Sequence, residues 1–296
     1  LYSRVGNSMS NFTDFIGGGS ASQINEVVSL NATADTVTLE DGRVYLRGGL
    51  YETDASVYPN AATPIGYTGT NFSVASQDAT PFGITWDGTH LWVLGTSTDS
   101  VYKYTSAGVY TGTSFSVASQ DSTPMGITWD GTHFWVIGTA TDSVYKYTSA
   151  GVYTGTSFTP SEVITPEDIV WDGTYFWLLA NGYDTVYKYS SAGTYQNVSF
   201  YVGGQAPSPT GITWDGTYFW VSDKSSDAVY KYNASGVYQN TTFNVQIQDP
   251  NPSGIVWDGT NFWVVGYTRF SVHKYKPLVG VLADLSFGAH NYVRVA

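Results

Sequence analysis

The chain has 296 residues, of which 42% are hydrophobic and 16% aromatic, so it is long enough to bury a sizeable core. Charged residues make up only 12%, against about a quarter in typical soluble domains. The net charge of −12 disfavours contact with nucleic acid, and no apolar stretch approaches the roughly 18–20 residues of a membrane-spanning helix. The absence of cysteine excludes disulfides, thiolate metal ligands and a cysteine nucleophile.

Residues 1–66 have no repeat character. Two short runs within them, Val37-Thr38-Leu39 and Val44-Tyr45-Leu46, have the composition of strands. We expect these strands to belong to a small β-rich segment that is separate from the repeats and anchors the chain.

A hairpin motif, Trp-Asp-Gly-Thr, then appears five times. The copies begin at Trp86, Trp129, Trp171, Trp214 and Trp257, at intervals of 43, 42, 43 and 43 residues. A fixed period of this length is typical of one supersecondary unit that is stacked repeatedly. Asp is expected to cap the turn and Gly to supply its positive φ.

The second copy shows what one repeat contains. Short alternating runs predict strands over 126–129, 133–137, 143–147 and 152–158, separated by turns at 130–132 and 149–151. Four short antiparallel strands in about 43 residues are typical of a propeller blade. A proline precedes each first strand, where it cannot interrupt the ladder. These prolines are Pro81, Pro124, Pro166, Pro209 and Pro252.

Aromatic residues recur at fixed places in each copy. The third strand reads Tyr-Lys-Tyr in four copies and His273-Lys274-Tyr275 in the last. The second strand carries a tryptophan at positions 92, 135, 177, 220 and 263. These rings are expected to fill the gaps between neighbouring sheets, with a role as sugar-stacking platforms as the second interpretation.

The number of strands predicts five blades. The fourth strand of the repeat occurs first at 67–74, ahead of any complete blade, and no fourth strand follows the last copy. Strand 67–74 is therefore expected to complete the final blade and close the ring over 67–276. Residues 39–59 echo the hairpin faintly, which leaves six blades as the alternative.

Residues 277–296 follow without repeat character and end in an alternating strand, Asn291-Tyr292-Val293-Arg294-Val295-Ala296. Both non-repeating ends leave the ring at the same seam, so they are expected to pair into one small β module. The fold class is thus an all-β five-bladed propeller with a module formed by the two terminal segments.

Candidate binding residues lie in the loops that lead into the first and third strands of each copy. Aspartates precede the third strand at Asp99, Asp142, Asp184 and Asp227, and the pairs Gln77-Asp78, Gln120-Asp121 and Gln248-Asp249 precede first strands. This acidic set could hold a sugar or a cation, although capping of the loops is the favoured interpretation. Two residues that break the repeat, Glu167 and Arg269, complete the candidate set.

No catalytic constellation is predicted. Glu167 and Asp168 are the only carboxylates on a first strand, and no second blade provides a partner for them. His90 and His133 occupy equivalent positions in adjacent copies, too far apart to share a metal. We expect no enzyme activity, no metal and no cofactor.

The wording Pro-Thr-Gly-Ile-Thr-Trp-Asp-Gly-Thr-Tyr-Phe-Trp-Val at 209–221, followed by Ala-Val-Tyr-Lys-Tyr at 228–232, loosely resembles propeller repeats of the NHL type. It is more similar to the WDGT-repeat propellers of bacteriophage structural proteins, such as tail fibres and capsid appendages. Segments at 39–49 and the closing Tyr-Val-Arg-Val are similar to the same proteins.

This resemblance implies a non-enzymatic structural and adhesion protein on a virion surface. Its partners would be other virion proteins or copies of itself, together with a host-surface glycan. The alternative is a free, secreted, lectin-like propeller that binds carbohydrate.

Overall fold

A computed structural model describes residues 65–277 in full and the backbone of five short strands outside them. The chain divides into two compact units, one of Ile65–Pro277 and one of Leu1–Pro64 with Leu278–Ala296. Among the described residues, no helix is long and apolar enough to cross a bilayer.

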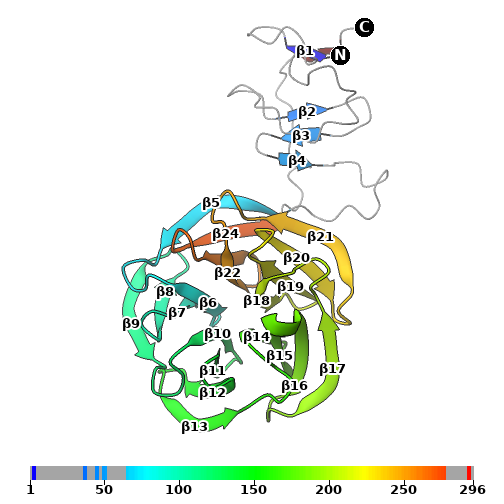
Figure 1. The fold of residues 1–296 in the computed structure, drawn as a ribbon. Coiled ribbons are helices and arrows are strands. Elements are labelled where there is room, and N and C mark those ends of the chain that lie inside the picture. Colours follow the sequence, from blue (N-terminus) through cyan, green and yellow to red (C-terminus); the bar gives the residue numbers. More distant parts are fainter. Residues whose placement is uncertain are drawn as a thin grey trace. The chain divides into compact units, whose positions relative to one another are not determined.

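The larger unit is a ring of five antiparallel sheets, each with four strands (Figure 1). This confirms the predicted five-bladed propeller. The blades are β6 (Pro81–Trp86), β7 (His90–Gly95), β8 (Ser100–Thr105) and β9 (Tyr110–Ser116); β10 (Pro124–Trp129), β11 (His133–Gly138), β12 (Ser143–Thr148) and β13 (Tyr153–Phe158); β14 (Pro166–Trp171), β15 (Tyr175–Ala180), β16 (Thr185–Ser190) and β17 (Tyr195–Tyr201); β18 (Pro209–Trp214), β19 (Tyr218–Asp223), β20 (Ala228–Asn233) and β21 (Tyr238–Asn244); and β22 (Pro252–Trp257), β23 (Phe262–Gly266), β24 (Ser271–Pro277) and β5 (Ile65–Ser73).

The ring closes where β5 pairs with β24, as the strand count predicts. The register places Val272 opposite Phe72 and Tyr275 opposite Tyr67, so the first strand of the ring supplies the outer edge of the last blade. This pairing gives the last blade its fourth strand, so β24 does not end the blade as an unpaired edge.

Each inner strand begins at its proline, two residues earlier than the sequence pattern indicates. In β10 the register with β11 shifts between Pro124 and Gly126, so the proline lies beyond a bulge where its missing N–H costs no ladder bond. The hairpin that follows turns through Gly131, whose φ of 96° favours glycine.

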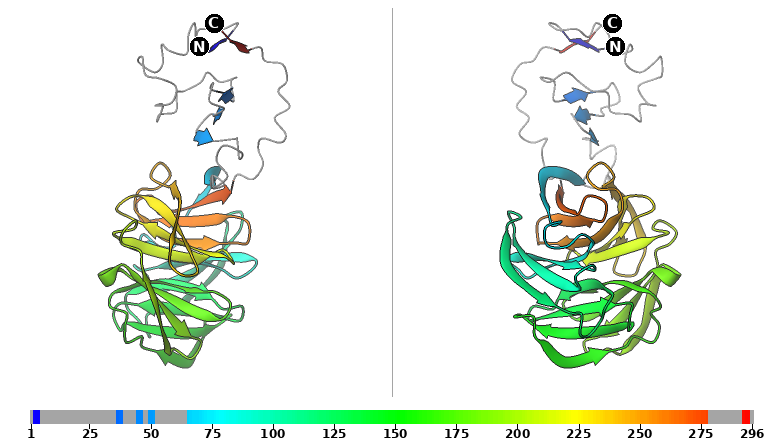
Figure 2. Two further views of the ribbon diagram at one scale, coloured as in Figure 1. Left: turned by 90° about the vertical axis from the view of Figure 1, so that its right-hand side faces the viewer. Right: turned by 60° about the vertical axis from the view of Figure 1, so that its left-hand side comes forward.

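The two faces of the ring carry different loops (Figure 2). We call the face at which each inner strand begins the proline face, and the face of the Trp-Asp-Gly-Thr turns the hairpin face. The proline face also carries the loops between the second and third strands of each blade. One of these loops contains the 3-10 helix η3 (Asn181–Tyr183), the coiled ribbon near the inner strands in Figure 1.

Five hydrophobic clusters fill the five gaps between blades, as predicted. In the gap between blades 1 and 2, Trp92 packs against Phe134, with ring centroids 4.7 Å apart, and Tyr147 packs from the other side. The second-strand tryptophans are at most 4% exposed, which leaves them no face for stacking on a sugar. Each blade therefore presents its tryptophan to the next blade and a buried tyrosine to the previous one.

The five strands outside the ring form two small sheets. β1 (Tyr2–Arg4) pairs antiparallel with β25 (Tyr292–Arg294), so the two terminal segments do join in one sheet. β2 (Thr36–Thr38), β3 (Val44–Leu46) and β4 (Gly49–Tyr51) form a second sheet of their own. The alternative of a sixth blade built from 39–59 is therefore wrong.

His273 breaks the repeat next to the seam. It stands where the other third strands carry Tyr102, Tyr145, Tyr187 and Tyr230. Its ring is buried 6.0 Å from that of Tyr67, and neither ring nitrogen has a hydrogen-bond partner within residues 65–277. Burial, with a smaller contribution from the charge of Arg269, lowers the pKa of His273 to about 4.

We predict that His273 makes the ring sensitive to acid. The folded pKa of about 4 lies below the unfolded value near 6.5, so the unfolded chain binds the proton more strongly between these values. The contribution of His273 to the free energy of unfolding is therefore fully present above about pH 6.5. It falls by up to about 3 kcal/mol as the pH drops towards 4. His273→Tyr should remove this loss in denaturation curves recorded from pH 7.5 to 4.

A matched control is His133→Tyr, which copies Tyr175 at a partly exposed position. That variant should keep the acid sensitivity of the native chain. Equal pH profiles for native protein and His273→Tyr would show that the seam histidine does not titrate as stated.

Candidate functional site

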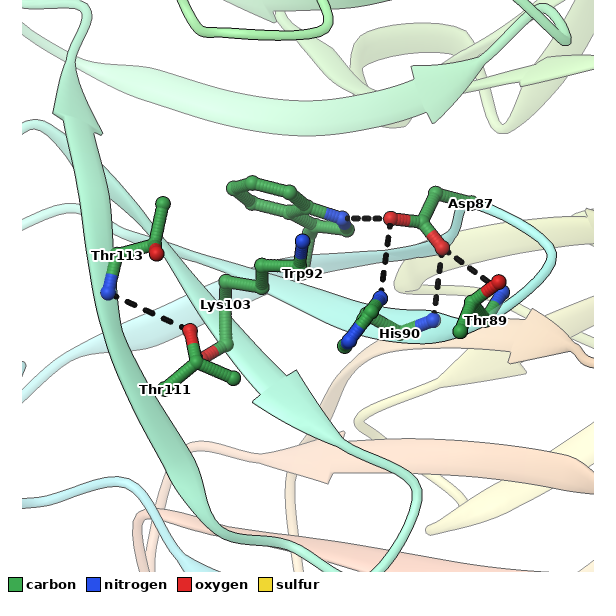
Figure 3. Close-up of polar contacts among 7 residues, drawn as sticks. All are labelled: Asp87, Thr89, His90, Trp92, Lys103, Thr111 and Thr113. Carbon is green, nitrogen blue, oxygen red and sulfur yellow. Dashed lines mark hydrogen bonds and ion pairs between the residues drawn. The ribbon is translucent and has the colours of Figure 1, made fainter.

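The repeated aspartate of the hairpin holds its turn and a tryptophan together (Figure 3). Asp87 Oδ1 accepts the N–H groups of Thr89 and His90 at 2.8 and 2.7 Å, and Oδ2 accepts Trp92 Nε1–H at 2.7 Å. The same indole bond recurs at 2.6–2.7 Å in the other four blades, from Trp135 to Asp130, Trp177 to Asp172, Trp220 to Asp215 and Trp263 to Asp258. These carboxylates are structural, which confirms the capping interpretation.

Lysines of the third strand lie over the same indoles. Lys103 Nζ is 5.1 Å from the Trp92 ring centre; Figure 3 draws both side chains. In blade 4, Lys231 Nζ also lies 3.7 Å from the centre of the Tyr218 ring. Burial lowers the pKa of Lys231, and the charge of Asp215 partly offsets this by raising it.

The two hairpin histidines stay apart. His90 Nδ1 and His133 Nδ1 each lie near the aspartate of their own hairpin, at 3.6 and 3.8 Å. Nowhere in the described part of the chain do three His, Asp or Glu side chains gather closely enough to hold a metal ion.

The candidate aspartates on the proline face share one backbone conformation rather than one site. Asp99, Asp142, Asp184 and Asp227 have φ between 47° and 51°, a left-handed conformation that Asp tolerates and that ends the loop before the third strand. Each belongs to a different blade. Burial raises the pKa of Asp99, helped by the charges of Asp121 and Asp78, and burial and Asp223 raise that of Asp184.

The aspartates of the Gln-Asp pairs are buried loop anchors and do not form an open acidic surface. Asp78 accepts hydrogen bonds from both the backbone and the hydroxyl of Thr80 and Thr98, and from the Ser97 hydroxyl. Burial raises its pKa, but these donors outweigh burial and lower it overall. Gln77 accepts the Tyr104 hydroxyl at 3.0 Å, which ties the loop to the blade. Binding of a cation or sugar by these Gln-Asp pairs is thus disfavoured, because the acceptor atoms of the anchor carboxylate are occupied.

The same anchor is built differently in blade 4. There Ala206 replaces the loop aspartate, and Asp223 stands at the end of the second strand where blade 1 has Gly95. Asp223 Oδ1 accepts the N–H groups of Ser225 and Ser226 at 3.0 and 2.8 Å. A Cβ on Gly95 would lie 2.1 Å from the Asp78 carboxylate, so only one of the two positions can hold the acid.

Arg269 joins an anchor as well. Its N–H donates to Asp249 Oδ2 at 2.9 Å. Burial raises the pKa of Asp249, opposed by its two backbone donors and by the Arg269 charge.

Glu167 and Asp168 form a buried acidic pair in the inner strand of blade 3. Asp168 is bonded to the N–H groups of Ile169 and Ile212 at 2.8 and 2.9 Å, so it joins blade 3 to blade 4. Glu167 is 9% exposed; Oε1 accepts Asn181 Nδ2–H at 3.0 Å, and Oε2 has no partner within residues 65–277. Burial raises the pKa of both carboxyls.

Three exposed residues of blade 3 were not among the candidates predicted from the sequence. Tyr183 and Tyr201 are 55% and 63% exposed, and Ile164 is 52% exposed. We call Ile164, Tyr183, Asp184 and Tyr201 the blade-3 rim. Blades 1, 2 and 4 carry Thr98, Thr141 and Ser226 in place of Tyr183. Comparison of the copies shows the substitution, but the exposure of the rings comes only from the structure.

The comparisons with known proteins agree on fold alone. No protein-family model matches the chain, and no curated protein matches it. Among solved structures, glutaminyl cyclase of Myxococcus xanthus is similar with a TM-score of 0.56 and 10% identity, covering 72% of this chain and 95% of that one. Virginiamycin B lyase of Staphylococcus aureus follows with a TM-score of 0.45, 18% identity and coverage of 81% and 79%. A nidogen/laminin complex follows with 0.44, 15%, and coverage of 64% and 73%. The chain is a β-propeller with repeat-like blades.

We predict that Asp130→Ala destabilises the ring by about 3 kcal/mol, because it leaves the buried Trp135 Nε1–H and two turn N–H groups without their acceptor. Chemical denaturation measures the loss. Asp142→Asn is the control, since Asn also tolerates the left-handed conformation, and it should change stability by less than about 0.5 kcal/mol. Equal losses in both variants would contradict the structural role of the hairpin aspartate.

The anchor of blade 4 should be transferable. Asp223→Gly alone removes the acceptor, and Ala206→Asp alone crowds a second carboxylate against the first, so each should cost about 2–3 kcal/mol. The double variant recreates the arrangement of blade 1 and should recover near-native stability. A double-mutant cycle would then show about 2 kcal/mol or more of favourable coupling, whereas additive losses would refute the equivalence.

Proposed function

We propose that the chain is a non-enzymatic structural and adhesion protein of a virion, which displays the propeller for recognition of a host surface or glycan. The observation that carries this proposal is the distribution of differences among the blades. The hairpin face repeats the same Asp–Trp bond five times, whereas the large exposed side chains that break the repeat, among them Tyr183 and Tyr267, lie on the proline face. A scaffold that is constant on one face and variable on the other suits display.

The state of the acidic groups supports a binding role over catalysis. The hairpin carboxylates and the loop anchors are occupied by hydrogen bonds within the scaffold. Glu167 is buried, and the acid next to it, Asp168, is bonded to backbone N–H groups. A general acid paired with a second free carboxylate is what glycoside hydrolysis would require.

The terminal segments supply the proposed anchor. β1 and β25 pair in one sheet, so both ends of the chain belong to one unit apart from the ring. In the alternative, a free lectin-like propeller, this unit would have no partner. Ultracentrifugation and cross-linking of the full chain separate the two: association through 1–64 and 278–296 favours the virion protein, and a strict monomer favours the lectin.

The recognition role is tested with the labelled full chain on a glycan array and on a panel of microbial cell envelopes. One variant replaces four proline-face residues with those of other blades: Ile164→Ser, Tyr183→Thr, Ile247→Ser and Tyr267→Thr. We expect at least a tenfold loss of binding. The matched control changes Val109, Val152 and Val237 on the opposite turns to Thr, the residue at 194, and should bind as the native chain does.

Two results would contradict the proposal. One is that the native chain binds neither glycan nor envelope, or that the control loses binding as fully as the proline-face variant. The other is turnover of a glycan or lactone that Glu167→Ala abolishes, which would make the chain an enzyme.

A further inference from the structure

We propose that the blade-3 rim is a carbohydrate site that takes one uncharged sugar ring between Tyr183, Tyr201 and the Asp184 carboxylate. This inference rests on the proposed recognition function and assigns it to one place. It also separates Asp184 from the equivalent aspartates Asp99, Asp142 and Asp227, whose blades have no tyrosine at the positions of Tyr183 and Tyr201.

The rim is continuous. Val202 N–H donates to the Asp184 carbonyl at 2.8 Å, so the strand end with Tyr201 is tied to the loop with Tyr183. A Cβ on Gly203 would lie 2.4 Å from Tyr201 Oη and 2.7 Å from Asp184 Oδ2. The Tyr201 hydroxyl and the Asp184 carboxylate therefore lie close together against the backbone of Gly203, where a side chain would displace them; blades 1 and 2 begin this loop with Ala75 and Ala118.

The chemistry of the rim fits a sugar. Tyrosine offers a flat apolar ring, on which the C–H face of a pyranose packs, and a hydroxyl at its edge. The Asp184 carboxylate accepts no hydrogen bond from any side chain or backbone group of residues 65–277, so both of its oxygens can accept one from a ligand. A sugar hydroxyl donating to such a charged acceptor forms a strong, directional bond.

Charge and size select the class of ligand. The proline-face loops of blade 3, at 159–165, 181–184 and 201–208, contain two charged side chains, Glu162 and Asp184, and both are acidic. Together with the net charge of −12, this disfavours sialylated or sulfated sugars. Three exposed side chains offer far less than the roughly 800 Å² that each partner of a stable protein complex buries, so a glycan fits better than a protein.

The test uses the full chain on an array of neutral, amino, sulfated and sialylated oligosaccharides, and saturation-transfer NMR with methyl glycosides of neutral hexoses. The variants are Tyr183→Thr and Tyr201→Ser, which copy Thr141 and Ser116. Each should weaken binding of the neutral ligand about tenfold, as expected for loss of an aromatic contact. Asp184→Asn, which keeps the left-handed backbone, should weaken binding of the neutral ligand several-fold. This variant still tests the site if a tyrosine variant proves unstable.

Val152→Thr, on the opposite turns, is the control and should bind as the native chain does. Native-like binding by the three rim variants would overturn the site while leaving the recognition function intact. Binding of acidic sugars alone would overturn the ligand class. If the native chain binds no glycan and no cell envelope, the rim proposal and the proposed function both fail.

Discussion

The hydrogen bond between the hairpin aspartate and the indole of the tryptophan five residues later is the interaction on which the ring depends. One carboxylate accepts two turn N–H groups and Trp Nε1–H, so it fixes both the hairpin and the direction of the tryptophan. The tryptophan then enters the gap to the next blade, where Trp135 meets Phe176 at 4.8 Å. Local turn chemistry is thereby coupled to long-range packing, and five repetitions of that coupling set the geometry of the propeller.

Because the hairpin face determines how the blades pack, the loops of the proline face can be anchored differently in each blade. Blade 1 anchors its loop with Asp78 and leaves Gly95 bare, and blade 4 reverses the two roles with Ala206 and Asp223. Blade 3 has Val163 in this position and uses Glu162 to accept the Tyr189 hydroxyl at 2.8 Å. Each solution ties the loop to its blade by hydrogen bonds, so the backbone is kept while the exposed chemistry changes.

The sequence was sufficient for the fold because every level of it has the same period. The turn residues, the aromatic positions and the displaced strand at 67–74 all repeat together, and they predict the blades, their number and the seam. The site was less accessible for a physical reason. Asp78 and Asp184 look alike in the sequence as loop acids, yet the carboxylate of Asp78 accepts five hydrogen bonds and that of Asp184 accepts none from residues 65–277. That difference depends on loops that are about 20 residues apart along the chain, and spacing alone does not reveal which of them meet.

The departures from the repeat do not all have the same meaning. Those of blade 5, including His273, Arg269 and Phe270, adjoin the seam, where Val74 N–H donates to the Phe270 carbonyl at 2.8 Å and the two ends of the ring must fit. Closure accounts for them. Blade 3 lies two gaps away from the seam, and its inner acids, its shortened loop and its exposed tyrosines have no such constraint. Five equal copies would give five equal surfaces, so a single irregular blade far from the closure is where a ring of this kind can hold one distinct site.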